Sequence, residues 1–117
     1  MSWNKKSVAV LLLPLLLLGC ASVPVAAKAV CTPRTDHPLR FVDVFDGSAE
    51  ELAMLVPDKA KARSGHWTLG YVYDAKRFVT VRCRYADGQT VDVKLAERIN
   101  RCDYKINAKK TLALYCK

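Results

Sequence analysis

Hydrophobic and polar residues alternate along the second half of the chain with the period of two that is typical of β-strands. Residues 67–73, 79–85 and 91–95 each place apolar side chains on every second position. We expect turns at residues 74–77 and 87–89 to join these segments into an antiparallel meander, in which Tyr85 opposes Trp67 in the first hairpin and Val91 in the second. The apolar face of the meander then points towards the core.

A further hairpin is predicted over residues 102–116, because the sequence is symmetric about Lys109. Folding it there opposes Ile106 to Leu112, Tyr104 to Leu114 and Cys102 to Cys116, all on one face. The other face is mostly polar. The register therefore predicts a Cys102–Cys116 disulfide.

The segment before the meander combines a strand signal with a helix signal. Residues 39–45 read as a strand that ends at a turn formed by Asp46 and Gly47. Ser48 and Glu51 have the spacing of a capping box, so we expect a helix over residues 48–56 that ends before Pro57. Its apolar face consists of Leu52, Leu55 and Val56.

These elements predict an α+β fold, a small antiparallel β-meander of four to six strands covered by one short helix and stapled by two disulfides. We expect three parts: a lipoprotein-type signal peptide at residues 1–19, a tether at residues 20–38, and a single α+β domain at residues 39–117 that is pinned by Cys31. A length of 117 residues suits one domain.

The first residues have the pattern of an export signal. Lys5 and Lys6 precede an apolar run at residues 8–18, which is too short to span a bilayer. The sequence Leu17-Leu18-Gly19-Cys20 resembles the lipobox of bacterial lipoproteins. That resemblance implies lipidation of Cys20, membrane attachment through the N-terminal lipid and, with Ala21 next, an outer-membrane protein that faces the periplasm. The alternative is cleavage after Ala27, which gives a soluble periplasmic or secreted protein.

The remaining four cysteines predict two disulfides, because an exported chain folds in an oxidising compartment. If Cys102 bonds to Cys116, Cys31 is left to bond to Cys83. Their spacing contains no Cys-x-x-Cys pair and no nearby His, so we expect neither a metal site nor a cofactor.

The net charge is +8, and residues 57–117 hold fourteen basic and six acidic groups. In the envelope such a surface fits an anionic component or a protein partner, whereas nucleic acid is not expected there. The predicted register places Arg84 opposite Asp92, and Arg82 beside the like charge of Lys94. The candidate anion-binding residues are Lys59, Lys61, Arg63, Arg82, Arg84 and Lys94.

No catalytic arrangement is visible in the sequence. His37 and His66 belong to no recognisable motif, and helix capping and turn formation account for most of the clustered carboxylates at residues 43–51. The expected disulfides leave no free thiolate. We expect a protein that is not an enzyme.

Several short motifs occur in order along the chain: Cys31-x-Pro33, residues 44–47 (Val-Phe-Asp-Gly), residues 55–58 (Leu-Val-Pro-Asp), Trp67, residues 83–85 (Cys-Arg-Tyr) and Cys102. Together they resemble a family of small exported proteobacterial proteins of unknown function. The chain is also similar to the small periplasmic and lipoprotein inhibitors of lysozyme in signal, size and disulfides, but it lacks their acidity.

Our leading interpretation is a non-enzymatic envelope lipoprotein domain that presents a basic surface to an anionic envelope component or protein partner. The alternative is a periplasmic inhibitor or accessory protein of an envelope enzyme, which would use an exposed aromatic residue such as Tyr115.

Overall fold

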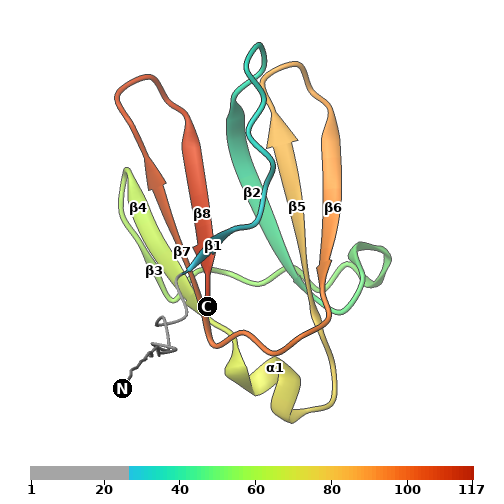
Figure 1. Ribbon diagram of the computed structural model, residues 1–117. Helices are drawn as coiled ribbons and strands as arrows, with labels where there is room; N and C mark the ends of the chain where they lie inside the picture. Colours follow the sequence, from blue (N-terminus) through green and yellow to red (C-terminus); the bar gives the residue numbers. More distant parts are fainter. Residues whose placement is uncertain (1–26) are drawn as a thin grey trace, which may run out of the picture.

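The computed structural model describes residues 27–117, which contain eight strands in two antiparallel sheets (Figure 1). The five-stranded sheet has the order β1-β8-β7-β4-β3 and the three-stranded sheet the order β2-β5-β6. The strands are β1 (Lys28–Ala29), β2 (Leu39–Asp46), β3 (Lys59–Ala60), β4 (Ser64–Thr68), β5 (Val79–Tyr85), β6 (Thr90–Leu95), β7 (Arg101–Ile106) and β8 (Leu112–Cys116).

This architecture corrects the expected fold class, since the protein is β-rich and is not a single meander covered by a helix. Within the described residues, helical structure is limited to the short helix α1 (Gly70–Asp74) and a 3-10 turn at Ala49–Glu51. Figure 1 shows the two sheets diverging away from α1. The core therefore lies between two sheets.

The first predicted hairpin is wrong, because the Trp67 strand does not pair with β5. Trp67 lies in β4 and pairs with Cys102 of β7, in the other sheet. After β4 the chain turns into α1, in which Val72 is buried and Tyr71 is exposed, and Leu69 is buried at the N-cap of this helix. The segment at residues 67–73 alternates as a strand would, but Leu69, Val72 and Tyr73 also have the i, i+3, i+4 spacing of a helix face. Here the helical period decides the structure.

The β5–β6 hairpin forms, but its register differs by two residues from the expected one. Cys83 opposes Val91, and Arg82 opposes Asp92. The turn begins one residue earlier than expected, since the Tyr85 N–H donates to the Gln89 carbonyl at 2.9 Å. A shift of two preserves which face is apolar but changes every cross-strand charge pair.

The predicted helix at residues 48–56 is also wrong. Its first turn forms at Ala49–Glu51, and Glu51 accepts a hydrogen bond from the Ser48 N–H at 3.0 Å, as a capping box requires. Leu52 then adopts a left-handed conformation with φ 60°, which ends the turn. The following residues run extended along the outer edge of β2 because its open backbone groups offer them hydrogen bonds.

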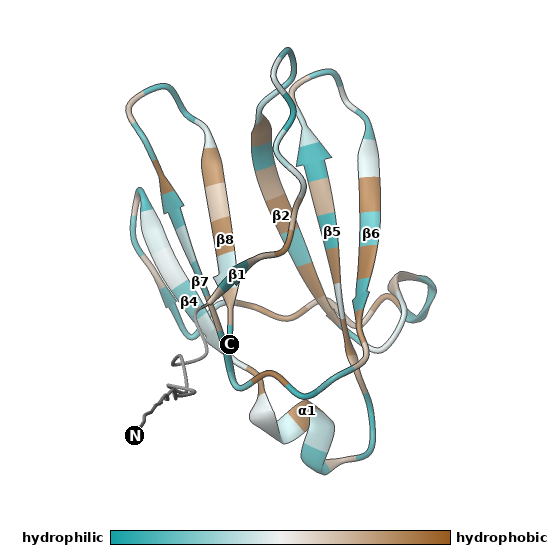
Figure 2. Cartoon of the chain, in the orientation of Figure 1, coloured by the Kyte–Doolittle hydropathy of each residue, from teal (hydrophilic) through white to brown (hydrophobic). Residues whose placement is uncertain are grey.

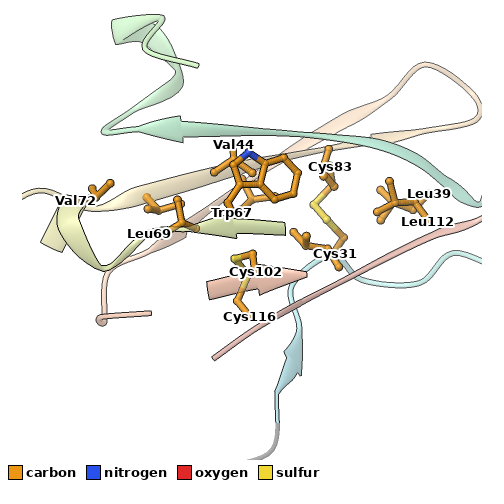
Figure 3. Packing of buried hydrophobic residues seen from close by; sticks show 14 of the residues in the cluster. Cys31, Leu39, Val44, Trp67, Leu69, Val72, Cys83, Cys102, Leu112 and Cys116 are labelled. Atoms are coloured by element: carbon orange, nitrogen blue, oxygen red, sulfur yellow. A yellow bond between two sulfur atoms is a disulfide. The ribbon is translucent and has the colours of Figure 1, made fainter. Parts of the chain in front are cut away.

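Buried side chains from both sheets form one hydrophobic cluster (Figure 3). Val44 of β2 and Val81 of β5 are fully buried, and they pack in the same cluster as Trp67 and Leu114 from the larger sheet. Figure 2 shows the hydrophobic and hydrophilic residues alternating along β6, as half-buried strands require.

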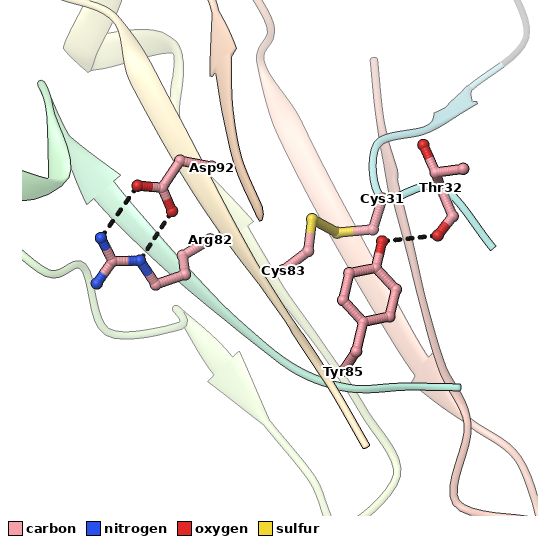
Figure 4. The surroundings of a disulfide bond; sticks show 6 residues. All are labelled: Cys31, Thr32, Arg82, Cys83, Tyr85 and Asp92. Carbon is pink, nitrogen blue, oxygen red and sulfur yellow. Dashed lines mark hydrogen bonds and ion pairs between the residues drawn. A yellow bond between two sulfur atoms is a disulfide. The ribbon is translucent and has the colours of Figure 1, made fainter. Parts of the chain in front are cut away.

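The two disulfides join the pairs that the sequence predicts. Cys102–Cys116 links directly opposed residues of β7 and β8, in the hairpin register expected from the sequence. Cys31–Cys83 ties the segment after β1 to the central strand of the smaller sheet, and beside it the Tyr85 hydroxyl donates to the Thr32 carbonyl at 2.6 Å (Figure 4).

The described part of the expected tether lies against the folded unit, since β1 pairs with β8. Residues 1–19 and Cys20 lie outside the described residues, so the signal peptide and the lipidation of Cys20 stay predictions. No helix among residues 27–117 has the length and hydrophobicity needed to cross a membrane.

Candidate functional site

An apolar groove of about 570 Å³ lies between β2 of the smaller sheet and the β4, β7 and β8 strands of the larger sheet. Its floor includes the buried side chains of Val42, Val44 and Trp67. Residues 54–57 line it as well, because the chain there runs beside the C-terminal half of β2. The groove is thus an open continuation of the hydrophobic core.

Three large hydrophobic side chains that line this groove are exposed to solvent. The exposed fractions are 63% for Phe41, 55% for Met54 and 84% for Val56. A second hollow, of about 550 Å³ beside β6, is lined by half-buried Val93, Leu95 and Ile99 without a large exposed hydrophobic residue. A cluster of exposed apolar side chains in a concave site is typical of a binding surface.

The backbone of residues 53–55 is fixed to the edge of β2, and this brings Met54 and Val56 to the groove. The Asp46 N–H donates to the Ala53 carbonyl at 2.9 Å, and the Leu55 N–H donates to the Val44 carbonyl at 2.7 Å. Pro57 follows and has no N–H to continue the ladder. We call residues 53–56 the edge segment.

Trp67 holds the edge segment against the larger sheet. Its indole N–H donates to the Leu55 carbonyl at 3.0 Å, and its ring lies 5.5 Å from that of Tyr104, centroid to centroid. Tyr104 in turn packs on Gly65, where a Cβ atom would collide with the tyrosine ring and with the Lys59 carbonyl. The wall formed by β4 and β7 therefore depends on a glycine at residue 65.

The turn that precedes the edge segment is held by ion pairs. Arg77 contacts Asp46 and Glu51, each at 2.6 Å. The pKa of Glu51 is lowered, first by the hydrogen bond from the Ser48 backbone and then by the one from Arg77. Glu51 thus fixes the turn in its charged form.

The structure divides the six candidate anion-binding residues into two groups. Lys59, Lys61 and Arg63 are exposed on β3 and the β3–β4 turn, and Lys61 lines the groove. None of the three makes an ion pair within the part of the chain that the structure describes.

The other three lie on the outer face of the smaller sheet and have partners already. Arg82 pairs with Asp92 at 2.8 Å, and this hydrogen bond lowers the pKa of Asp92 (Figure 4). Arg84 pairs with Asp43, and the Lys94 ammonium lies 4.3 Å from the centre of the Phe78 ring. The expected pairs Arg84–Asp92 and Arg82–Lys94 are therefore wrong, since the register is shifted.

The residues considered for catalysis serve other contacts. His37 lies 3.9 Å from Asp87, next to the β5–β6 turn, and His66 lies in β4 opposite Asp103. Asp43, Asp46 and Glu51 are engaged by arginines. Among residues 27–117, no three His, Cys, Asp or Glu residues come together in a way that could hold a metal ion.

Sequence reasoning missed the groove because it assigned residues 52–56 to a helix with a buried face. One signal was available: residues 52–56 are all apolar, and a short apolar run that ends at a proline fits a strand as well as a helix. Tyr115, the aromatic residue named for a partner contact, is 44% exposed on β8 but does not line the groove.

Comparison with protein families gives a match over most of the chain. The matching family model is described as "Type VI secretion system Tli immunity protein", and the match covers residues 32–117. Neither the curated proteins nor the solved structures give a match. The region that matches contains the Cys102–Cys116 disulfide and the whole groove, and it begins one residue after Cys31. The chain therefore belongs to the type VI secretion system Tli immunity protein family.

Proposed function

We propose that this protein is an immunity protein that binds a type VI secretion effector and blocks its action. The family supports a role in immunity, which requires a protein partner. This places the inhibitor interpretation ahead of the role of presenting a basic surface to an envelope component. Protection by binding needs no catalytic group in the immunity protein.

The observation that carries the choice of site is the exposure of Phe41, Met54 and Val56 around one apolar groove. Binding hot spots are apolar and aromatic anchors that become buried in the interface, and the groove is lined mostly by apolar and aromatic residues. The effector would bury these side chains and thereby occupy the groove. We propose further that the predicted signal exports the chain, so that the encounter takes place in the cell envelope.

A competition assay tests the function. We delete the gene in its own strain and grow the mutant with the parent strain, which carries an active type VI secretion apparatus. We expect the parent to kill the mutant, inactivation of the apparatus to stop the killing, and the restored gene to protect. Survival of the mutant beside the active parent would contradict the proposal. The effector is then identified as the one whose deletion from the parent ends the killing.

Two matched variants test the site. Phe41→Ser removes an exposed aromatic side chain from the groove, and Tyr115→Ser removes one from β8, outside the groove. We expect Phe41→Ser to raise the Kd for the purified effector by at least about 30-fold, a hot-spot effect, and Tyr115→Ser to leave it near the wild-type value. Equal effects of the two variants would place the interface elsewhere. Unfolding curves confirm that both variants fold.

A further inference from the structure

A group of cations that have no carboxylate partner among residues 27–117 lies beside the apolar groove. It comprises Lys59, Lys61 and Arg63 around the β3–β4 turn, and Lys105, Lys109 and Lys110 at the end of β7 and in the β7–β8 turn. The two turns are held together, since the Ile106 N–H donates to the Arg63 carbonyl at 2.8 Å. We call these six residues the basic tip.

The basic tip also lacks acids in its own sequence. No Asp or Glu occurs at residues 59–73 or 104–117. The nearest acids along the chain are engaged elsewhere: Asp58 accepts a hydrogen bond from the Thr68 N–H, and Asp103 pairs with Arg101. Within the described residues, no ion pair therefore compensates the positive charge of the basic tip.

The arginines on the rest of the molecule differ in this respect. Arg34, Arg77, Arg82, Arg84, Arg98 and Arg101 each contact a carboxylate. Arg40 adds to the tip instead, because its guanidinium donates to the carbonyls of Lys109 and Lys110. Lys28, Lys76 and Lys117 also make no ion pair among the described residues, but they lie outside the tip, whereas the tip gathers six such cations and Arg40 next to the groove.

We propose that the effector binds with an acidic surface, in which an apolar ridge enters the groove and flanking carboxylates face the basic tip. This inference rests on the proposed function and adds the chemistry of the partner. Charge complementarity of this kind speeds the encounter and fixes the orientation of a complex. A convex protein ridge also fits the concave groove, whereas a flat bilayer surface does not reach its floor.

The test uses two variants with the same change in net charge. Lys59→Glu/Lys61→Glu/Arg63→Glu reverses three charges of the basic tip, and Lys28→Glu/Lys76→Glu/Lys117→Glu reverses three exposed charges outside it. The control residues lie in β1, after α1 and at the C-terminus, near the end of the molecule where the sheets meet α1 (Figure 1). All six positions are exposed, so both variants should fold.

The probe is the effector identified by the competition assay, and association rates are measured at about 50 mM and 500 mM NaCl. We expect the tip variant to slow association by at least about 10-fold at low salt, with the difference shrinking to less than about 3-fold at high salt. The control variant should stay within about 3-fold of wild type at both salt concentrations. Equal slowing by the two variants would overturn the inference.

A second arm separates the effector from a lipid as the source of the negative charge. The same variants are tested with vesicles of phosphatidylglycerol. If the tip variant loses vesicle binding and binds the effector normally, the basic tip serves a membrane and the inference fails. If the deletion strain is not killed at all, the proposed function fails. If Phe41→Ser weakens effector binding and the tip variant binds the effector as wild type does, the site stands and only the acidic partner surface is wrong.

Discussion

The hydrophobic core and the apolar groove occupy the space between the same two sheets, yet one is closed and the other is open. β2 contributes to both: Val44 is fully buried, whereas Phe41, three residues earlier, is 63% exposed. The core is closed by side chains from both sheets and by the Cys31–Cys83 disulfide. The groove is bordered by the edge segment, which is bound to β2 by the backbone hydrogen bonds at Ala53 and Leu55.

This difference between the closed core and the open groove assigns stability to the core side chains and partner binding to the groove side chains. A side chain buried in the core stabilises the fold by its transfer from water, at roughly 25 cal/mol for each Å² of apolar surface. Exposed apolar side chains in the groove gain that free energy only when a partner covers them. Substitutions in the core should therefore change the unfolding free energy, and substitutions in the groove should change binding.

The largest effect is expected from removing the disulfide that closes the core. Cys31→Ala/Cys83→Ala opens a loop between residues 52 positions apart, against 14 for Cys102→Ala/Cys116→Ala. The chain-entropy model gives losses of about 4 and about 3 kcal/mol. Guanidinium unfolding measures both. A larger loss for the Cys102 and Cys116 variant would show that chain entropy does not set the order.

A smaller effect is expected where the two regions meet, at Trp67. Trp67→Phe keeps an aromatic ring in the core but removes the hydrogen bond to the Leu55 carbonyl. We expect a loss of about 2 kcal/mol in unfolding free energy and a Kd for the effector about 10-fold higher, because the edge segment loses its tie to β4.

Tyr104→Phe is the matched control for that variant. It also removes a polar atom from an aromatic side chain beside the groove, but its hydroxyl makes only a long contact of 3.4 Å with the Lys61 carbonyl. We expect less than about 0.5 kcal/mol of destabilisation. If Trp67→Phe binds the effector as tightly as Tyr104→Phe does, the edge segment does not depend on the indole.

The closed region was easier to predict from the sequence than the open one. Strict alternation and the symmetric cysteines predicted the β7–β8 hairpin with its register, because one face of that hairpin is buried and a slip of one residue would expose it. The disulfide pairing followed by elimination. The β5–β6 register was wrong by two, since such a shift keeps the apolar face inside and only the turn geometry decides.

Sequence patterns failed where tertiary contacts override local preference. Residues 48–56 carry a helix start and a helical apolar spacing, but the free edge of β2 offers backbone partners that an isolated helix cannot match. The assignment of Trp67 to the same sheet as β5 failed because α1 intervenes. The six candidate anion-binding residues could not be separated by sequence, since only the fold shows which arginines have a carboxylate.

The smallest effect concerns the ion pairs that hold the turn before the edge segment. The folded-state pKa of Glu51 lies below its ordinary value of 4.5, so its charged form stabilises the fold. That contribution is present above the unfolded pKa and is lost as the pH falls through the folded pKa. Because Glu51 is exposed, solvent screens the effect and its size is far below that of the disulfide.

Glu51→Gln and Glu50→Gln form a matched pair for this prediction, because both change one exposed carboxylate of the same turn. Glu50 makes no hydrogen bond or ion pair among the described residues, whereas Glu51 accepts hydrogen bonds from Ser48 and Arg77. We expect Glu51→Gln to lose less unfolding free energy than wild type between pH 6 and pH 3, and Glu50→Gln to follow the wild type. Urea unfolding at both pH values measures this. Identical profiles for the two variants would mean that Arg77 holds the turn through Asp46 alone, and that the edge segment is positioned by β2 and Trp67 without help from Glu51.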